Sequence, residues 1–394
     1  MFLKRVAMVF VAVVAVVTVT GLFPQTASAS NIAVAGFAFA GDAGTAKTRF
    51  PQSYAVYERM RATPGQSFSR LLVDRSAAVK NPAFELMAPD KMMNLKASDQ
   101  ALMTVLVLSG ETILTENFGS YYKTFVNLRG EALIFDFKSK TVVRSYPINA
   151  ALFDATPVPP SEARIGRFVE ELLTKEEGKG LFTQYLNRLA SATLPAPGTR
   201  TIQVRKAEMA PEALALMPEA LRSQPKIIES MLADSFGSVL SAKAGVPVLP
   251  SGAGHAMGTM AMRLENGDDV QLKIGEGDYL FDIKINKFAK IKTAETRVGT
   301  SYVYGAYANI HFFEPTLNTD YINTDLKNGE SAVVPAGLVS TDDFAAYQDA
   351  IRGMFLKLAD AFEGADPKWV TTAASAKDIT KQIEATRTIL KASK

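Results

Sequence analysis

The most regular pattern of apolar and polar positions lies in the second half of the chain. Phe281, Ile283 and Ile285 alternate with three polar residues, which is typical of a strand with one buried face and one wet face. The unbroken apolar run at 32–39 instead predicts a strand that is buried on both faces. Both kinds of strand are therefore expected in this fold.

The first half of the chain also carries segments with apolar residues at helical spacing. We expect the segment after the opening strand to be a loop, and residues 138–140 to be the turn of a hairpin. The further strands are predicted at 84–87, 102–108, 126–136 and 141–146, and the helices at 64–80, 161–174 and 181–189.

The second half repeats this order of elements. Its strands are predicted at 201–207, 246–249, 281–286 and 302–313, and its helices at 226–242, 344–362 and 373–392. Corresponding elements recur at offsets of roughly 170 to 180 residues, which indicates an internal duplication. Two unrelated domains of the same class are the alternative.

The two halves are separated by a segment rich in proline and glycine at 194–198, which we interpret as a linker. The predicted fold class is α+β, with two similar domains at 30–193 and 199–394. Each domain is expected to be a small mixed sheet with helices packed on one side.

Residues 1–29 have the three zones of a secretory signal peptide. Lys4 and Arg5 precede a mostly apolar stretch at 6–23, and Ala27 and Ala29 suit the subsites of a signal peptidase. We expect cleavage after Ala29 and a periplasmic or otherwise exported protein. The alternative is an uncleaved anchor, since 6–23 is nearly long enough to span a bilayer; no other membrane span is expected.

The chain has no cysteine. This excludes disulfides, the lipidation site of bacterial lipoproteins, thiolate metal sites and thiol nucleophiles. Loss of Lys4 and Arg5 with the signal peptide would lower the formal net charge from +3 to +1. A protein of such low net charge has no global field that attracts nucleic acid, so no nucleic-acid partner is expected.

The first half resembles the family that contains the amino-terminal domain of TolB and the curli-secretion protein CsgG. The resemblance spans about 32–148 and rests on short motifs: a strand that ends in a small residue and an acid at Asp42, a glycine-containing strand with Gly110, and a long hairpin with Asp136 before its turn. The second half, from about 201 to 313, is a weaker match.

The resemblance implies an envelope protein that binds or assembles partner proteins through a sheet edge or groove, and it carries over no catalytic residue. The chain departs from the family in two ways: many members are lipoproteins, and no propeller follows the first domain here. We therefore expect a non-catalytic protein in the cell envelope, with envelope proteins or glycans as partners.

Few residues suggest catalytic or metal-binding chemistry. The only histidines are His255, in a glycine-rich loop without a P-loop ending, and His311, which we expect to be a hydrogen-bonded residue among aromatics on a strand. The segment 318–330 is rich in Asn and Asp, but its spacing does not match an EF-hand, so a solvated loop is favoured over a calcium site. Catalytic residues, cofactors and resident metals are all expected to be absent.

Two other functions stay open. A carboxylate-dependent glycan or peptidoglycan hydrolase would need two carboxylates about 5 to 9.5 Å apart in a cleft. A periplasmic solute- or polysaccharide-binding protein would be favoured by Tyr302, Tyr304 or Trp369 in a groove between the domains. Tyr307 is expected to point to the other side of its strand, because side chains alternate along a strand.

Overall fold

The computed structural model describes residues 30–88, 101–177, 180–251, 259–265, 267–337 and 342–394. The predicted signal peptide and its alternative, a membrane anchor at 6–23, lie outside these ranges. Within them, no helix has the length and apolar character needed to cross a bilayer. The fold is α+β, built from two mixed sheets and the helices that pack on them, as the sequence predicts.

The first sheet, called sheet A, has strand order β2-β1-β3-β4-β5-β8-β7. In the first half, three helices follow the opening strand and two follow the last strand, and both predicted helices after the hairpin are confirmed. The strands are β1 (Ser30–Ala40), β2 (Phe84–Met87), β3 (Leu102–Asn117), β4 (Tyr122–Asp136) and β5 (Thr141–Thr156), and the helices are α1 (Ala43–Arg49), α2 (Pro51–Arg61), α3 (Phe68–Ser76), α4 (Glu162–Thr174) and α5 (Leu181–Ser191).

The second sheet, called sheet B, has strand order β11-β10-β9-β6. Its strands are β6 (Ile202–Met209), β9 (Tyr279–Thr296), β10 (Gly299–Glu314) and β11 (Thr319–Pro335). Its helices are α6 (Pro211–Leu214), α7 (Glu219–Arg222), α8 (Pro225–Ala244), α9 (Asp343–Glu363), α10 (Lys368–Ala373) and α11 (Ile379–Ala392).

The two halves share one connectivity, as the duplication hypothesis requires. In each, the opening strand pairs in parallel with the next long strand, and an antiparallel meander and helices follow: β1-β3-β4-β5 in sheet A and β6-β9-β10-β11 in sheet B. Register shifts also recur, after Val34 in β1 and Val204 in β6, and after Ile134 in β4 and Phe312 in β10. The paired register shifts lie 170 and 178 residues apart, within the range of 170 to 180 residues predicted from the sequence.

A hairpin from the second half of the sequence belongs to the first unit, across the predicted domain boundary at 194–198. Strands β7 (Thr259–Leu264) and β8 (Asp269–Lys273) belong to sheet A, where β7 pairs with β1 and β8 meets β5. Five of their apolar side chains are buried in the core of the first half: Met260, Met262, Leu264, Val270 and Leu272. The first unit is therefore discontinuous in sequence, and residues 30–193 do not contain its whole core.

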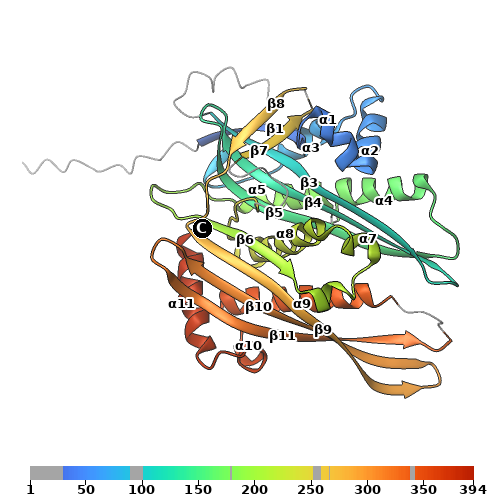
Figure 1. Cartoon of the computed structure of the whole chain (residues 1–394). Coiled ribbons are helices and arrows are strands. Elements are labelled where there is room, and N and C mark those ends of the chain that lie inside the picture. The colour runs from blue at the N-terminus through green and yellow to red at the C-terminus, as the bar shows by residue number, and fades with distance from the viewer. Residues whose placement is uncertain (1–29, 89–100, 178–179, 252–258, 266, 338–341) are drawn as a thin grey trace, which may run out of the picture.

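Helix α8 lies between the two sheets (Figure 1). It contacts β5 of sheet A and β6 of sheet B, whereas α3, α4 and α5 pack against sheet A. Side chains alternate between the two faces along β4, so Arg129 and Ile134, five positions apart, point to opposite faces. Arg129 pairs with Asp234 of α8, which places α8 on one face. Ile134 lies opposite Thr104, whose hydroxyl bonds Tyr185 of α5, which places α5 on the other face. Helices thus cover both faces of sheet A rather than one.

The segment 43–61, predicted to be a loop, forms α1 and α2. Asp42 and Thr45 make a capping box at the start of α1, and Pro51 occupies the first turn of α2. The predicted helix at 64–80 is shorter, because the side chain of Ser67 caps α3 and the helix ends at Ser76.

Two further predictions in the second half are wrong. Residues 246–249 are not a strand and make only one bridge, between Leu249 and Gln203. The Asn- and Asp-rich segment 318–330 is mostly strand β11 rather than a loop, with Asn318 in the left-handed turn that precedes it. Its polar residues alternate with buried Ile322, Thr324 and Leu326, which is the pattern of a half-buried strand.

Candidate interaction groove

The ends of β9, β10 and β11 extend past helix α9, and we call residues 291–303 and 331–335 the distal arm (Figure 1). All six final residues of β9, 291–296, are exposed. Three apolar residues of the arm are strongly exposed: Ile291 at 55%, Val298 at 80% and Val333 at 66%. Ile291 lies directly opposite Val303 on β10, so these side chains share one face of the arm.

A groove of about 300 Å³ runs beside the outer edge of β11. Six consecutive residues of β11, 330–335, line it, which means that the strand edge itself forms one wall. Ala345 and Ala346 of α9 form part of the facing wall, and their small side chains leave space there. Tyr121 and Lys123, at the end of the β3–β4 hairpin, reach the groove from the first unit.

The outer edge of the distal part of β11 has no strand partner within the described residues. β11 is the last strand of sheet B, and its recorded ladder is the one with β10. Nearer the middle of the strand the edge is occupied, because the amide of Asp325 bonds Ser375 and the amide of Asn323 bonds Gln382. Unpaired main-chain groups at an open edge can bind a further strand.

Ion pairs fix the mouth of the groove at the start of α9. Lys123 lies 2.5 Å from Asp342, which also caps α9 by accepting a hydrogen bond from the amide of Phe344. The adjacent Asp343 accepts a hydrogen bond from the Tyr304 hydroxyl at 2.7 Å and pairs with Lys290 at 2.8 Å. Burial, followed by this bond to Asp343, raises the pKa of Tyr304 well above its usual range.

The tyrosines are arranged as the alternation predicts. Tyr302 and Tyr304 lie 6.2 Å apart between ring centroids, with the Lys290 ammonium over both rings, while Tyr307 lies under Lys287 on the other face. Tyr304 lines the groove between the units, but Trp369 packs partly buried against the core of the second unit. Tyr304 thus meets the condition set for a solute- or polysaccharide-binding protein, whereas Trp369 is not among the residues that line this groove.

The histidine prediction is confirmed for His311 and lies outside the described residues for His255. The His311 imidazole is 2.7 Å from Asp320 and stacks on Phe313 with ring centroids 4.4 Å apart. Along β11, Asp325 accepts a hydrogen bond from Asn309, and Asn328 bonds Lys357. Within the described part of the chain, no group of three or more His, Cys, Asp or Glu side chains could hold a metal ion.

Three carboxylates line the groove: Glu330, Asp342 and Asp349. Glu330 pairs with Lys357 at 3.2 Å, and Asp342 pairs with Lys123. Burial raises the pKa of Asp349, the third of these carboxyls.

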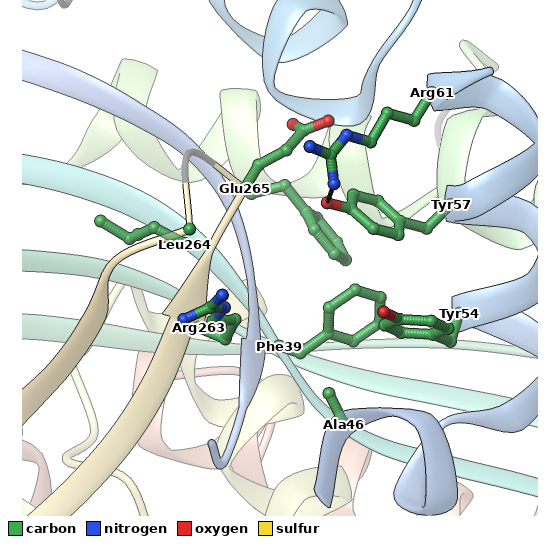
Figure 2. A pocket seen from close by; sticks show the side chains of 10 residues that line it. Phe39, Ala46, Tyr54, Tyr57, Arg61, Arg263, Leu264 and Glu265 are labelled. Carbon is green, nitrogen blue, oxygen red and sulfur yellow. Dashed lines mark hydrogen bonds between the residues drawn. The ribbon is translucent and has the colours of Figure 1, made fainter. Parts of the chain in front are cut away.

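A second cavity, of about 160 Å³, lies where the inserted hairpin docks on the first unit (Figure 2). Its wall is aromatic, with Phe39 and Tyr54 among its rings. Arg61 donates to the Tyr57 hydroxyl, and Arg263 pairs with Asp269. One carboxylate oxygen of Glu265 accepts from the amide of Ser69, whereas its Oε1 is buried without a hydrogen-bond partner among the described residues. We interpret this cavity as part of the packing between hairpin and helices.

Sequence reasoning missed the groove because it missed β11. The signal was present, since residues 322–327 alternate between less polar and polar positions. Asn, Asp and Gly dominate that segment, and their turn preference outweighed the alternation. The exposed valines of the arm gave no sequence signal at all, because a valine in a strand is usually buried.

Comparisons with known proteins do not assign a family. No family model matches the chain, and no curated protein matches it. Among solved structures, the chain is similar to a protein of Xanthomonas campestris described by the family model DUF330, with 15% sequence identity and a TM-score of 0.21. The match covers 46% of this chain and 92% of that one, and carries no argument about function.

Proposed function

We propose that this chain is an exported, non-catalytic protein of the cell envelope that binds a partner protein. In this proposal an extended segment of the partner adds to sheet B as a further strand beside β11. The observation that carries it is the groove whose wall is formed by six consecutive residues of an open strand edge. The family resemblance supports the same mode, since TolB-like and CsgG-like domains are binding or assembly modules.

The groove offers the two kinds of contact that strand addition uses. Main-chain groups along an edge supply affinity, and pockets for alternate side chains supply specificity. Here Val333 and Val334 present apolar side chains along the edge, and Ala345 and Ala346 leave room opposite. We expect the bound segment to carry small or apolar side chains at the positions that face α9.

Charge adds a second preference. Asp349 is exposed, lines the groove, and forms no ion pair or hydrogen bond within the described residues. A basic side chain of the partner would pair with it, since a rim charge mainly affects association rate and specificity. We therefore expect a basic residue in the bound segment.

The proposal is tested with Val333→Glu and Ala346→Trp. The first places a charge on the strand edge, and the second fills the groove. Partners are captured from native envelope extract by crosslinking and mass spectrometry. Both variants should reduce capture of one stoichiometric envelope protein by at least about tenfold, equivalent to about 1.4 kcal/mol.

Leu317→Glu is the matched control, because Leu317 is exposed to 64%, close to the value for Val333, but lies in the turn at the other end of β10 and β11. It should leave capture unchanged, and all three variants should keep the circular dichroism of the parent. Equal capture by the Val333 and Leu317 variants would argue against the groove.

A further inference from the structure

A smaller pocket lies between the two units and shares Asp349 with the groove. Its volume is about 130 Å³. Strands β4 and β5 form one wall, and helices α8 and α9 form the other. The two units therefore build this pocket together.

Most residues that line the pocket are polar, and most of these have side-chain atoms available to hydrogen-bond a ligand. Six of its side chains have donor or acceptor atoms with no hydrogen bond or ion pair inside the described part of the chain, although none of these atoms is a buried orphan. They are Asn149, Ser235, Ser238, Gln348, Asp349 and Arg352. The apolar part of the lining comes from Phe125, Ala151, Phe153, Met231 and Val239.

The pocket rests on a rigid polar floor. Asn127 is only 3% exposed, and its amide nitrogen donates to the Asn149 side-chain oxygen at 2.7 Å. Its side-chain oxygen accepts from Arg129 at 3.2 Å, and Arg129 pairs with Asp234 at 2.9 Å in the junction with α8. Because the Asn149 side-chain oxygen accepts from Asn127, the amide nitrogen of Asn149 is the group that can donate to a ligand. The buried contacts of Asn127 thus fix the orientation of Asn149.

From this lining we infer that the pocket binds a single neutral, polyhydroxylated ring, that is, one monosaccharide unit. Hydroxyl groups both donate and accept, and the lining supplies both functions: amides and serine hydroxyls, one carboxylate and one guanidinium. Asp349 and Arg352 contribute opposite charges, so the pocket has no net charge to select an ion. A cavity of about 150 Å³ holds one benzene ring. This pocket has a similar volume and includes the exposed Asp349 and Arg352 in its lining, so it takes one ring, with part of that ring in solvent.

A zwitterionic amino acid is the competing ligand. It would use Asp349 for its ammonium group and Arg352 for its carboxylate. Such a ligand would leave the four neutral polar side chains without partners, and a desolvated polar group without a hydrogen bond is costly. The monosaccharide satisfies more of the lining.

The test is a titration of the purified chain with glucose, galactose and N-acetylglucosamine, and with alanine and glutamate as the competing class, followed by saturation-transfer NMR. We expect at least one sugar to bind with a Kd of about 1 mM or tighter. Gln348→Leu and Ser235→Ala should each weaken that binding at least about fivefold, because each removes a hydrogen-bonding group with only a small change of side-chain volume.

Gln271→Leu is the control, since Gln271 lies exposed on β8 and away from the pocket; it should bind the sugar like the parent. Absence of sugar binding, tighter binding of an amino acid, or equal binding by the pocket variants and the control would each overturn the inference. Partner capture through the β11 groove is a separate assay, so failure of one proposal leaves the other testable.

Discussion

At the residue scale, the most unusual side chain is Glu131, which is 2% exposed at the junction of sheet A with α8. Burial raises its pKa well above 4.5, and the nearby Asp234 carboxylate raises it further. Its neighbours do little to favour the charged form: Ser145 donates one hydrogen bond to it, and Arg129 is already paired with Asp234. Glu131 therefore keeps its proton to a higher pH in the folded chain than in the unfolded chain.

This protonation predicts a pH dependence of stability. The folded chain holds the Glu131 proton to a higher pH than the unfolded chain, so its contribution to stability is full below about pH 4.5 and is lost as the pH rises toward the folded pKa. Glu131→Gln should remove this loss. Urea unfolding at pH 5 and pH 8 gives the free energy of unfolding of both chains. The stability of the variant relative to the parent should be higher at pH 8 than at pH 5, by about 1.4 kcal/mol for each unit by which the folded pKa of Glu131 exceeds 5, up to pH 8. Parallel stability curves would contradict the assignment.

Gly36 is a second residue whose identity is set by geometry. Its φ is +92°, and a Cβ at this position would lie 2.4 Å from Ser69 Oγ, the atom that accepts the amide hydrogen of Phe37. Gly36→Ala should therefore destabilise the chain by about 1 to 3 kcal/mol through backbone strain and the clash. Thermal unfolding measures this, with Gly65→Ala as a comparison in which only the positive φ is present.

At the element scale, the ion pair between β4 and α8 joins the two units. Arg129 and Asp234 are both nearly fully buried, and Thr112 and Asn127 accept further hydrogen bonds from the guanidinium. Removing one partner leaves the other charge buried without compensation, so Arg129→Met or Asp234→Leu should each cost about 3 to 5 kcal/mol. The double variant should cost less than either single variant, and a urea double-mutant cycle measures the difference. Additive losses would contradict a coupled pair.

Most elements of the fold were predictable because their residue periods were unambiguous. The hairpin at 138–140, the helices after it, and α8 and α9 follow from apolar spacing, and all are confirmed. Elements whose start depends on local hydrogen bonds were missed, as with α1 and its capping box at Asp42. β11 was missed because its turn-forming residues are held in a strand by pairing with β10, a tertiary contact that no local pattern reveals.

The groove was less predictable than the fold. Tyr304 was singled out and does line it, but the edge of β11 and the alanines of α9 become neighbours only in three dimensions. Alternation along β10 places Tyr302 and Tyr304 on one face and Tyr307 on the other, as the sequence predicts.

At the scale of the whole molecule, the hairpin β7–β8 makes the first unit depend on the second half of the chain. A fragment that ends at residue 198 lacks five buried side chains of its own core. This fragment should not unfold cooperatively in urea, since it exposes the surface that those side chains cover. Appending residues 259–273 through a flexible linker should restore a cooperative transition.

Far-UV circular dichroism is the suitable probe, because the only tryptophan, Trp369, lies in the second half. A cooperative transition of the unmodified fragment would show that the first half is independent.

The central claim is that a partner protein binds as a strand beside β11. The most direct measurement places a photo-crosslinking amino acid at position 333 in cells and maps the products by mass spectrometry, with position 317 as the control. The claim predicts crosslinks from position 333 to one short extended segment of a single envelope protein, and none from position 317. Crosslinks that are absent at 333, or spread over many proteins equally from both positions, would contradict it.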